Sequence, residues 1–561
     1  MKVTGAQAIL KSLLHEEVDL VFGYPGGAIM PLYDALYDVQ SELRHVLVRH
    51  EQGAVHAAEG YARLSGKVGV CMVTSGPGAT NLVTGIADAM IDSVPLVCLT
   101  GQVSSTLLGT DAFQEADIVG ITLSVTKWNF QITCAEEIPS VMAKAFYHAR
   151  TGRPGPVLID ITKDAQLGFL DFSYKSFTPP KVLPHLNELN DLELLTAAEL
   201  INQAKKPYLL VGQGITISHA EEALVCFAEK TGIPVASTLL GLSTFPADHP
   251  LYVGMLGMHG NYGANLLTND ADLLIAVGMR FDDRVTSDLS RYAKHAKVIH
   301  IEIDPAEINK NVHADLALLS DAKCALEQLT PLVKRVTHTD WLNQFKICKH
   351  AEYEKVISHE IQPDGGQIKM AEVVHQLSEK TAGQAILVTD VGQHQMIAAR
   401  YYQFKHTNSH ITSGGLGTMG FALPAAVGVS LAASGREVIA VIGDGGFQMN
   451  IQELGVIAQE NLPIKMVLLN NGYLGMVRQW QELFFDARYS FTELKNPDFI
   501  KIAEGYGIAA RRVENREQLE KAIHEMLKAK EPYLLEVVVE KQGNVFPMVP
   551  SGAAVDEVRL S

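Results

Sequence analysis

Short runs of apolar, often β-branched residues alternate with helix-length amphipathic segments along nearly the whole chain. This alternation is typical of parallel β-sheets that carry helices on both faces. We therefore predict an α/β protein with strands at residues 45–50, 68–74, 95–101, 153–162, 207–212, 233–238, 271–278, 297–304, 385–392, 436–446, 464–472 and 533–540.

The predicted elements fall into three units. A chain of 561 residues is too long for one hydrophobic core. Polar stretches with Pro, Ser or Asn at about 171–190 and 337–366 indicate connecting segments. The first and third units share a layout, so we predict two related doubly wound domains that flank a different, Rossmann-like one. The predicted boundaries are 1–165, 191–335 and 366–540, followed by a tail at 541–561.

Composition and charge narrow the class of protein. A net charge of −17 argues against nucleic acid as a partner. The six cysteines are scattered and lack metal-binding spacing, which favours a reducing compartment. No apolar leader opens the chain, so we expect a cytoplasmic protein. Residues 411–434 carry no charge, but their five glycines and Pro424 favour a buried loop and a core helix over a membrane span.

A Gly-Asp-Gly turn at 443–445 ends one predicted strand, and an Asn-Asn pair at 470–471 ends the next. A right-handed crossover through a helix of about 14 residues would place both strand ends at the sheet edge where α/β proteins bind ligands. A carboxylate and an amide oxygen suit Mg²⁺. Gly443, Gly445 and Gly446 would let a diphosphate approach the backbone at the start of the helix. A plain turn without a ligand is disfavoured, because both halves occur together.

This pairing resembles the signature of enzymes that use thiamine diphosphate. The resemblance implies that Asp444 and Asn471 bind Mg²⁺ through their side chains and Tyr473 through its backbone carbonyl. In such enzymes a glutamate bonded to the pyrimidine ring of the cofactor favours its imino tautomer, which acts as an internal base. Glu51, in Arg-His-Glu-Gln-Gly-Ala, matches that glutamate. Alone, it could equally be an ordinary carboxylate at a helix N-terminus.

Loops at other predicted strand ends add to this site. The backbone at Gly26 and Gly27 could approach a substrate oxygen, although Gly-Gly and Gly-Pro pairs are usually plain turns. By resemblance, Met419 lies beneath the cofactor and keeps its two rings bent, whereas methionine is more often core filler. The resemblance also implies catalytic roles for Gly27 and Gln114 beside Glu51. It implies contacts with thiamine diphosphate from Pro25, Gly26, Thr74, Pro77, Asn81, Val391, Gln393, His394, Gly417, Met419, Gly443, Gly445, Gly446 and Met476.

A closer resemblance covers nearly the full chain. Between residues 22 and 485 the following segments occur in order: FGYPGGAIMP, RHEQGA, TSGPGATNL, GTDAFQE, RPGPVLIDI, GMLGMHG, GMRFDDRV, DVGQHQM, GGLGTMGFALPAA and GMVRQWQELF. Together they resemble the catalytic large subunits of acetohydroxyacid synthases, the biosynthetic acetolactate synthases. This implies decarboxylation of pyruvate and transfer of the hydroxyethyl carbanion to a second pyruvate, giving 2-acetolactate, or to 2-oxobutyrate, giving 2-aceto-2-hydroxybutyrate. These are early steps towards valine, leucine and isoleucine.

The middle unit carries segments that, taken alone, are ordinary loops, and Arg-Phe-Asp-Asp-Arg at 280–284 could be a surface ion-pair cluster. By resemblance they form a site for FAD, which would be structural and undergo no net redox change. His259 is the weakest of these assignments, because histidines are often satisfied by local bonds. The implied FAD contacts are Arg153, Gly212, Gly214, Thr238, Leu239, Met255, Gly257, Met258, His259, Gly278, Arg280, Asp282, Arg284, Glu302, Ile303 and Asp321.

The resemblance also implies a substrate pocket and partners. Arg284 could clamp the carboxylate of the second 2-oxo acid. Trp480 would form a wall that favours 2-oxobutyrate, and Phe113 and Lys163 would line the same pocket. One cofactor must touch Glu51 and Asp444 in different units, so we expect at least a homodimer, with the first unit of one chain facing the third unit of another. A small regulatory subunit is implied, and the tail from Gln542 is expected to cover the site.

Three other functions are compatible with parts of the sequence. A flavin oxidase of the pyruvate-oxidase type would share the thiamine site and the three units, but Arg-Phe-Asp-Asp-Arg together with Trp480 disfavours it. A non-catalytic homologue tends to lose its site residues, whereas Glu51, Asp444 and Asn471 are present. A dinucleotide dehydrogenase would need Gly-x-Gly-x-x-Gly after a strand, and the sequence has none with the required acidic residue.

Overall fold

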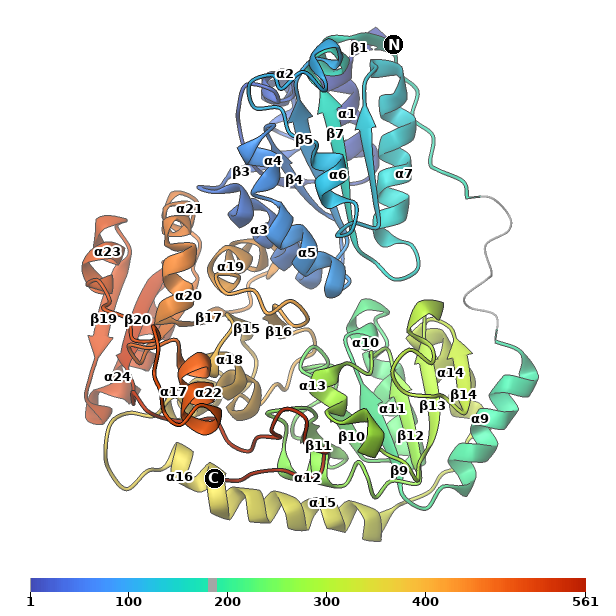
Figure 1. The fold of residues 1–561 in the computed structure, drawn as a ribbon, viewed down its shortest axis with the longest axis vertical. Coiled ribbons are helices and arrows are strands. Elements are labelled where there is room, and N and C mark those ends of the chain that lie inside the picture. Colours follow the sequence, from blue (N-terminus) through green and yellow to red (C-terminus); the bar gives the residue numbers. More distant parts are fainter. Residues whose placement is uncertain (1, 180–188) are drawn as a thin grey trace.

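The computed structural model describes residues 2–179 and 189–561 (Figure 1). It contains three six-stranded sheets, all parallel, and a short antiparallel pair of β1 (Lys2–Thr4) with β8 (Phe169–Asp171). This confirms the predicted class of three parallel α/β units. The predicted connector at 171–190 lies partly outside the described residues.

The first sheet has the strand order β3-β2-β4-β5-β7-β6. Along β4, Cys71 and Val73 enter one buried cluster while Val70 and Met72 enter another, so helices cover both faces. Its strands are β2 (Leu20–Tyr24), β3 (Arg44–Leu47), β4 (Gly69–Val73), β5 (Leu96–Gln102), β6 (Trp128–Ile132) and β7 (Pro156–Thr162). Its helices are α1 (Gly5–His15), α2 (Met30–Leu36), α3 (Glu51–Ser65), α4 (Pro77–Thr80), α5 (Val83–Ile91), α6 (Ile118–Thr122), α7 (Ile138–Arg150) and α8 (Lys163–Leu167).

The third sheet repeats the topology of the first. Its order β16-β15-β17-β18-β20-β19 matches that of the first sheet strand for strand, as the shared layout in the sequence predicts. Its strands are β15 (Ile386–Thr389), β16 (His410–Thr412), β17 (Val438–Gly443), β18 (Lys465–Asn470), β19 (Ala509–Val513) and β20 (Tyr533–Val538). Its helices are α17 (Met370–Lys380), α18 (Gln393–Tyr401), α19 (Ala422–Ala432), α20 (Asp444–Met449), α21 (Leu454–Gln459), α22 (Gly475–Phe484), α23 (Phe499–Gly505) and α24 (Arg516–Lys528).

The middle sheet is different. Its strand order is β11-β10-β9-β12-β13-β14. From β9 the chain first adds strands on one side of the sheet and then, from β12, on the other side, as in dinucleotide-binding folds. Its strands are β9 (Pro207–Val211), β10 (Val235–Ser237), β11 (Tyr252–Met255), β12 (Leu273–Val277), β13 (Lys297–Glu302) and β14 (Leu316–Leu319). Its helices are α9 (Asp191–Gln203), α10 (Gly214–Ile217), α11 (Glu221–Thr231), α12 (Tyr262–Leu266), α13 (Asp283–Thr286) and α14 (Ala322–Leu332).

The first and third units share a helical layer. Figure 1 shows α3 and α5 of the first unit lying against the third unit next to α19. A Cβ on Gly428 of α19 would lie 1.8 Å from the carbonyl oxygen of Ala57, so glycine permits this close helix contact. Eight of the eleven residues of α19 are buried, as predicted for the uncharged stretch. Within the described residues, no helix combines the length and apolar character needed to cross a membrane.

Two predictions about local structure are wrong. The connector at 337–366 contains the helix α15 (Thr339–Glu352), because Trp341, Phe345 and Cys348 form one apolar face that packs on Tyr208 of the middle unit and its surroundings. The single crossover helix after Asp444 is instead α20 and α21, separated by a 3₁₀ turn. The break falls at Asn450, whose φ is −133° and whose side-chain amide bonds the carbonyl oxygen of Gly420 at 2.7 Å.

Candidate active site

The Gly-Asp-Gly turn and the Asn-Asn pair meet at one edge of the third sheet. β17 and β18 are neighbours, with Gly443 paired to Leu469, so Asp444 and Asn471 follow adjacent strand ends. Asp444 Oδ2 accepts hydrogen bonds from the backbone N–H of Gly472 at 3.1 Å and from Asn496 Nδ2 at 2.6 Å. The carboxylate is thus surrounded by amides alone, which leaves its charge without a cationic partner among these contacts.

Burial raises the pKa of Asp444 to about 6. A buried carboxylate of this kind is stabilised in its charged form by a nearby cation. Asn471 supplies an amide oxygen close by, which accepts from the backbone N–H of Tyr473 at 3.1 Å. The donor set of carboxylate and amide oxygens fits Mg²⁺, which completes its shell with phosphate oxygens and water.

The turn beside Asp444 has room for nothing larger than glycine. A Cβ on Gly446 would lie 1.5 Å from Asp390 Oδ2, and a Cβ on Gly443 would lie 2.7 Å from His394 Nδ1. Burial lowers the pKa of His394 to about 3, so its imidazole is neutral at physiological pH. His394 Nε2 has no hydrogen-bond partner among the described residues. A buried polar atom without a protein partner is available to a ligand, and the close glycine backbone fits a diphosphate.

The described residues enclose a cavity of about 760 Å³ that extends from this turn to the middle sheet. Every residue predicted to bind a cofactor or substrate in the middle and third units lines it, together with the predicted metal ligands and Arg153 of the first unit. The cavity therefore joins the predicted diphosphate and flavin regions into one continuous space.

The middle unit contributes its strand ends to this cavity. Gly212 follows β9, Gly278 follows β12, and Glu302 ends β13. The lining therefore lies at the carboxyl edge of the sheet, at the point between β9 and β12 where the strand order changes side. Burial raises the pKa of Glu302 to about 7. Its Oε1 accepts from the backbone N–H groups of Ile303 and Asp304 at 2.9 and 3.2 Å. This is the position at which dinucleotide-binding sheets hold their ligands.

The Arg-Phe-Asp-Asp-Arg segment is not a tight surface ion-pair cluster. Asp282 caps α13, accepting from the backbone N–H groups of Arg284 and Val285 at 2.9 and 3.2 Å. The Arg284 side chain is 57% exposed, and its contact with Asp283 is a loose 3.6 Å. Its guanidinium lies 4.0 Å from the sulfur of Met258, another lining residue. Arg284 can therefore turn towards an anion in the cavity.

Helix α22 forms one wall of the cavity, and the C-terminal tail packs behind it. Met476 and Trp480 of α22 line the cavity, and the Trp480 residue is 39% exposed. Behind them, Gln479 exchanges hydrogen bonds with the backbone of Val545, at 2.9 Å from the Val545 N–H and 3.3 Å to its carbonyl. The tail continues to the middle unit, where the Val549 N–H donates to the carbonyl of Met258 at 2.8 Å. Figure 1 shows this segment crossing from α22 to the middle unit.

The remaining predicted residues lie apart from the cavity, at the carboxyl edge of the first sheet. Glu51 is the first residue of α3, and its Oε2 accepts from Asn81 Nδ2 at 2.9 Å. Thr74 lies between them and the Gly26 turn, because a Cβ on Gly26 would lie 2.5 Å from Thr74 Cβ. The backbone N–H of Ala28 donates to Thr74 Oγ1 at 3.3 Å. Neither Glu51 nor any other predicted residue of this edge lines the large cavity: Pro25, Gly26, Gly27, Thr74, Pro77, Asn81, Phe113, Gln114 and Lys163.

This second half-site is open to solvent in the single chain. Phe113 is 88% exposed at the tip of a loop that Glu115 closes by accepting from the backbone N–H groups of Gly109 and Ala112. Gln114 has a φ of +59°, and its backbone packs on Gly76. Lys163 is exposed at the start of α8. One chain thus presents two separate half-sites.

Several residues at these sites were not predictable from the sequence. Asn496 bonds the carboxylate of Asp444, yet it follows an irregular segment with no recognisable pattern. Ile91, Asp92 and Ser93, at the end of α5, line the large cavity. The apolar Pro-Leu-Val run that follows them marks a strand, but nothing local shows that the preceding turn reaches another unit.

The fold and the site agree with comparisons to known proteins. Residues 3–121, 194–329 and 390–537 match the N-terminal TPP binding, central and C-terminal TPP binding domains of thiamine pyrophosphate enzymes. The chain is 48% identical to the acetolactate synthase large subunit of Corynebacterium glutamicum, over 100% of this chain and 90% of the relative. It is 48% identical to the acetolactate synthase isozyme 2 large subunit of Escherichia coli, over 99% of each. It is 46% identical to acetolactate synthase 1, chloroplastic, of Nicotiana tabacum, over 99% of this chain and 84% of the relative.

The three matching domains define a thiamine pyrophosphate enzyme. Within that class, the chain belongs to the acetolactate synthase large-subunit family. The resemblance in the sequence is therefore confirmed at the level of the family.

Proposed function

We propose that the chain is the catalytic subunit of an acetolactate synthase: it decarboxylates pyruvate and joins the two-carbon unit to a second pyruvate or to 2-oxobutyrate. The observation that carries this is the meeting of Asp444 and Asn471 at adjacent strand ends, beside the glycine turn and His394. The membership of the family supports it. The reaction would take place in the cytoplasm.

The same geometry supports the proposed positions of the cofactors. Asp444, Asn471 and the carbonyl of Tyr473 would hold Mg²⁺, and the backbone at Gly443–Gly446 with His394 would hold the diphosphate. When bound, thiamine diphosphate supplies a nucleophilic carbon that bonds to the carbonyl carbon of the 2-oxo acid. The carboxyl edge of the middle sheet would hold FAD, with Glu302 accepting hydrogen bonds from hydroxyl groups. Neither a reductant nor an oxidant is needed, so the flavin would be structural.

Glu51 would hold a proton at a ring nitrogen of the pyrimidine. Asn81 fixes the carboxyl through the 2.9 Å bond to Oε2, which leaves Oε1 free of that contact to face the ligand. Gly27 would bring a backbone N–H towards the substrate oxygen, since a Cβ there meets nothing within 4 Å. Gln114 would lie at the same opening, on the loop that packs on Gly76.

A single chain would be inactive on this account. Glu51 lies outside the cavity that Asp444 lines, although one cofactor must contact both residues. We therefore assign Glu51 and Asp444 of one site to two different chains, with the exposed Phe113 loop of one chain covering the cavity of the other. The relatives named as large subunits further support a separate small subunit as a partner.

Substrate choice would depend on Arg284 and Trp480. The exposed guanidinium of Arg284 could bind the carboxylate of the second 2-oxo acid through two parallel hydrogen bonds. Trp480 would contact the extra methyl group of 2-oxobutyrate, since one methyl or methylene group in an apolar pocket is worth about 1–3 kcal/mol.

Trp480→Leu is expected to lower the preference for 2-oxobutyrate over pyruvate by roughly tenfold, because the contact with the extra methyl group is lost. A competition assay with both 2-oxo acids, with thiamine diphosphate, Mg²⁺ and FAD present, measures the ratio of the two products. Phe484→Leu is the matched control: it removes an aromatic ring from the same helix but does not line the cavity. An unchanged product ratio in Trp480→Leu would refute the proposed wall, and a parent protein that forms neither product would refute the proposed function.

A further inference from the structure

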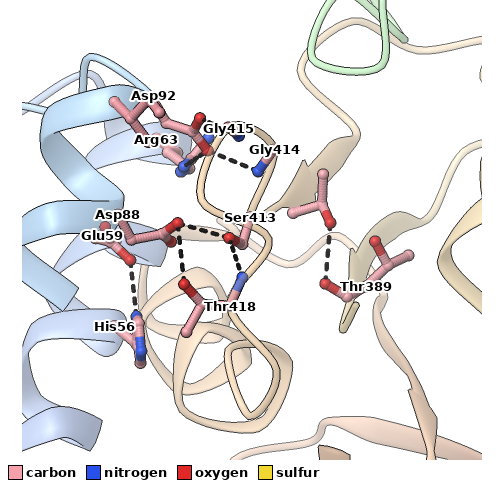
Figure 2. Close-up of polar contacts among 12 residues, drawn as sticks. His56, Glu59, Arg63, Asp88, Asp92, Thr389, Ser413, Gly414, Gly415 and Thr418 are labelled. Carbon is pink, nitrogen blue, oxygen red and sulfur yellow. Dashed lines mark hydrogen bonds and ion pairs between the residues drawn. The ribbon is translucent and has the colours of Figure 1, made fainter. Parts of the chain in front are cut away.

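A buried polar cluster joins the first unit to the loop before α19 (Figure 2). It comprises His56, Glu59 and Arg63 on α3, Asp88 on α5, Asp92 just after α5, and loop residues 413–418. His56, Glu59 and Asp88 are fully buried. We call it the interface cluster. The side chains of His56, Glu59, Arg63 and Asp88 have no part in the reaction proposed above.

Asp88 holds both ends of the loop. Its Oδ1 accepts hydrogen bonds from Ser413 Oγ at 2.6 Å and from Thr418 Oγ1 at 3.3 Å. Ser413 Oγ in turn accepts from the backbone N–H of Thr418 at 2.8 Å. The loop is thus closed on itself and attached to one carboxylate oxygen of a different unit (Figure 2).

Asp92, one turn further along, holds the middle of the loop. Its two oxygens accept from the backbone N–H groups of Gly414 at 2.8 Å and Gly415 at 2.7 Å. Arg63 donates to Asp92 Oδ2 at 2.8 Å, and this buried ion pair balances the charge of the carboxylate. Asp88 and Asp92 together therefore accept four hydrogen bonds from one short loop.

The rest of the cluster disfavours a charge on Asp88. Carboxylate oxygens of Asp88 and Glu59 lie within 4.8 Å of each other, so two negative charges there would repel. Burial raises the pKa of Asp88 to about 8 and that of Glu59 well above its usual range. Glu59 Oε2 also bonds His56 Nδ1 at 2.9 Å, and burial lowers the pKa of His56 to about 4. Asp88 Oδ1 can accept from the loop whether the carboxyl group is ionised or carries a proton on Oδ2.

The loop leads directly into the large cavity. Gly414, Gly415 and Gly417 line it, and so does Met419, whose Cε lies 3.5 Å from the point where a Cβ on Gly445 would stand. Just beyond Met419, the backbone N–H of Gly420 donates to Asp390 Oδ1 of the third unit at 2.9 Å. Met419 is thus held from two sides, and the first unit provides one of them.

From this arrangement we infer that Asp88 is a positioning residue for thiamine diphosphate: through Ser413 and Thr418 it sets the loop that places Met419 in the cavity. The inference rests on the proposed function, because it takes the space beside Met419 and Gly445 as the place of the cofactor. Asp88 touches no ligand itself, and its influence passes through the loop.

Titration of thiamine diphosphate with Mg²⁺ into the cofactor-free full-length protein, followed by calorimetry, tests this inference. Asp88→Ala should raise the dissociation constant roughly tenfold, since two bonds to a carboxylate are lost. Asp88→Asn should stay within about threefold of the parent, because its side-chain carbonyl can still accept from Ser413 and Thr418. Ser413→Ala removes the main bond from the loop side and should weaken binding severalfold.

Two further variants separate positioning from general stability. Asp160 is another buried carboxylate of the first unit, bonded to Thr100 at 2.7 Å and remote from the loop, so Asp160→Ala should lower the unfolding temperature without changing the dissociation constant. In the double variant, Ser413→Ala should add less than a twofold effect to Asp88→Ala. Wild-type affinity for thiamine diphosphate in both Asp88→Ala and Ser413→Ala would overturn the inference. So would a double variant whose dissociation constant rises by the product of the two single effects. Either result would leave the proposed function intact. A parent protein that binds no thiamine diphosphate would overturn both the inference and the proposed function.

Discussion

Glu51→Gln is expected to lower turnover of pyruvate by about 10²–10⁴-fold, the range in which a positioned acid or base contributes to catalysis. Glutamine can keep the bond from Asn81, so the half-site stays intact, but its amide cannot hold and release a proton at the pyrimidine. The measurement is kcat for acetolactate formation at saturating cofactor, together with the unfolding temperature, which should change little.

The competing role for Glu51 is that of an ordinary carboxylate at a helix N-terminus, worth about 0.3–1 kcal/mol of stability. Glu221 offers the matched control, since it occupies the first position of α11 as Glu51 does in α3, and it lies outside the cavity lining. Glu221→Gln should leave kcat unchanged. If Glu51→Gln retained turnover within a few-fold of the parent, the catalytic assignment would be wrong and the helix role would stand.

Asp444→Ala is expected to weaken binding of thiamine diphosphate with Mg²⁺ by more than about 100-fold, because loss even of a group that only supports a ligand costs about 10–100-fold in metal affinity. The remaining oxygens of Asn471 and Tyr473 carry no full charge to offset that of the cation. Calorimetric titration of both cofactors measures the effect, and the unfolding temperature shows whether the fold persists. If Asp444→Ala bound the two cofactors within tenfold of the parent, Asp444 would not be a metal ligand.

Mixing the two inactive variants tests whether the half-sites meet between chains. A mixed dimer of Glu51→Gln and Asp444→Ala contains one site with both defects and one site with neither. Subunits refolded or co-expressed together should therefore recover activity that neither variant shows alone. If each site lay within one chain, every site would keep one defect, and mixing would restore nothing.

Most interior strands of the three sheets were predictable from the sequence, because a strand buried on both faces is a continuous apolar run. The exception is β2 (Leu20–Tyr24), an interior strand of the first sheet that the prediction missed. The strands that escaped prediction in the middle and third units are β11, β14, β16 and β19, which are the edge strands of their sheets. An edge strand is short and partly exposed, so its apolar signal is weak. In α15 the signal was present in the spacing of Trp341 and Phe345, but the polar residues around them concealed it.

The meeting of Asp444 and Asn471 at neighbouring strand ends was predictable from residues alone, since adjacent parallel strands bring their carboxyl ends together wherever the crossover is right-handed. The roles of most other site residues came from resemblance and not from spacing. Contacts between units left no local trace: Asp88 and Asp92 look like ordinary helix residues, and their partners at 413–418 lie in another unit. Such contacts depend on how the units dock, which no periodicity in the sequence encodes.

The most direct test is to strip the purified protein of Mg²⁺ and thiamine diphosphate by chelation and gel filtration, and to follow the condensation of pyruvate as each is added back. The account predicts background rates for the stripped protein and for protein given either component alone, with activity restored when both are present. Condensation at the original rate by the stripped protein would contradict it.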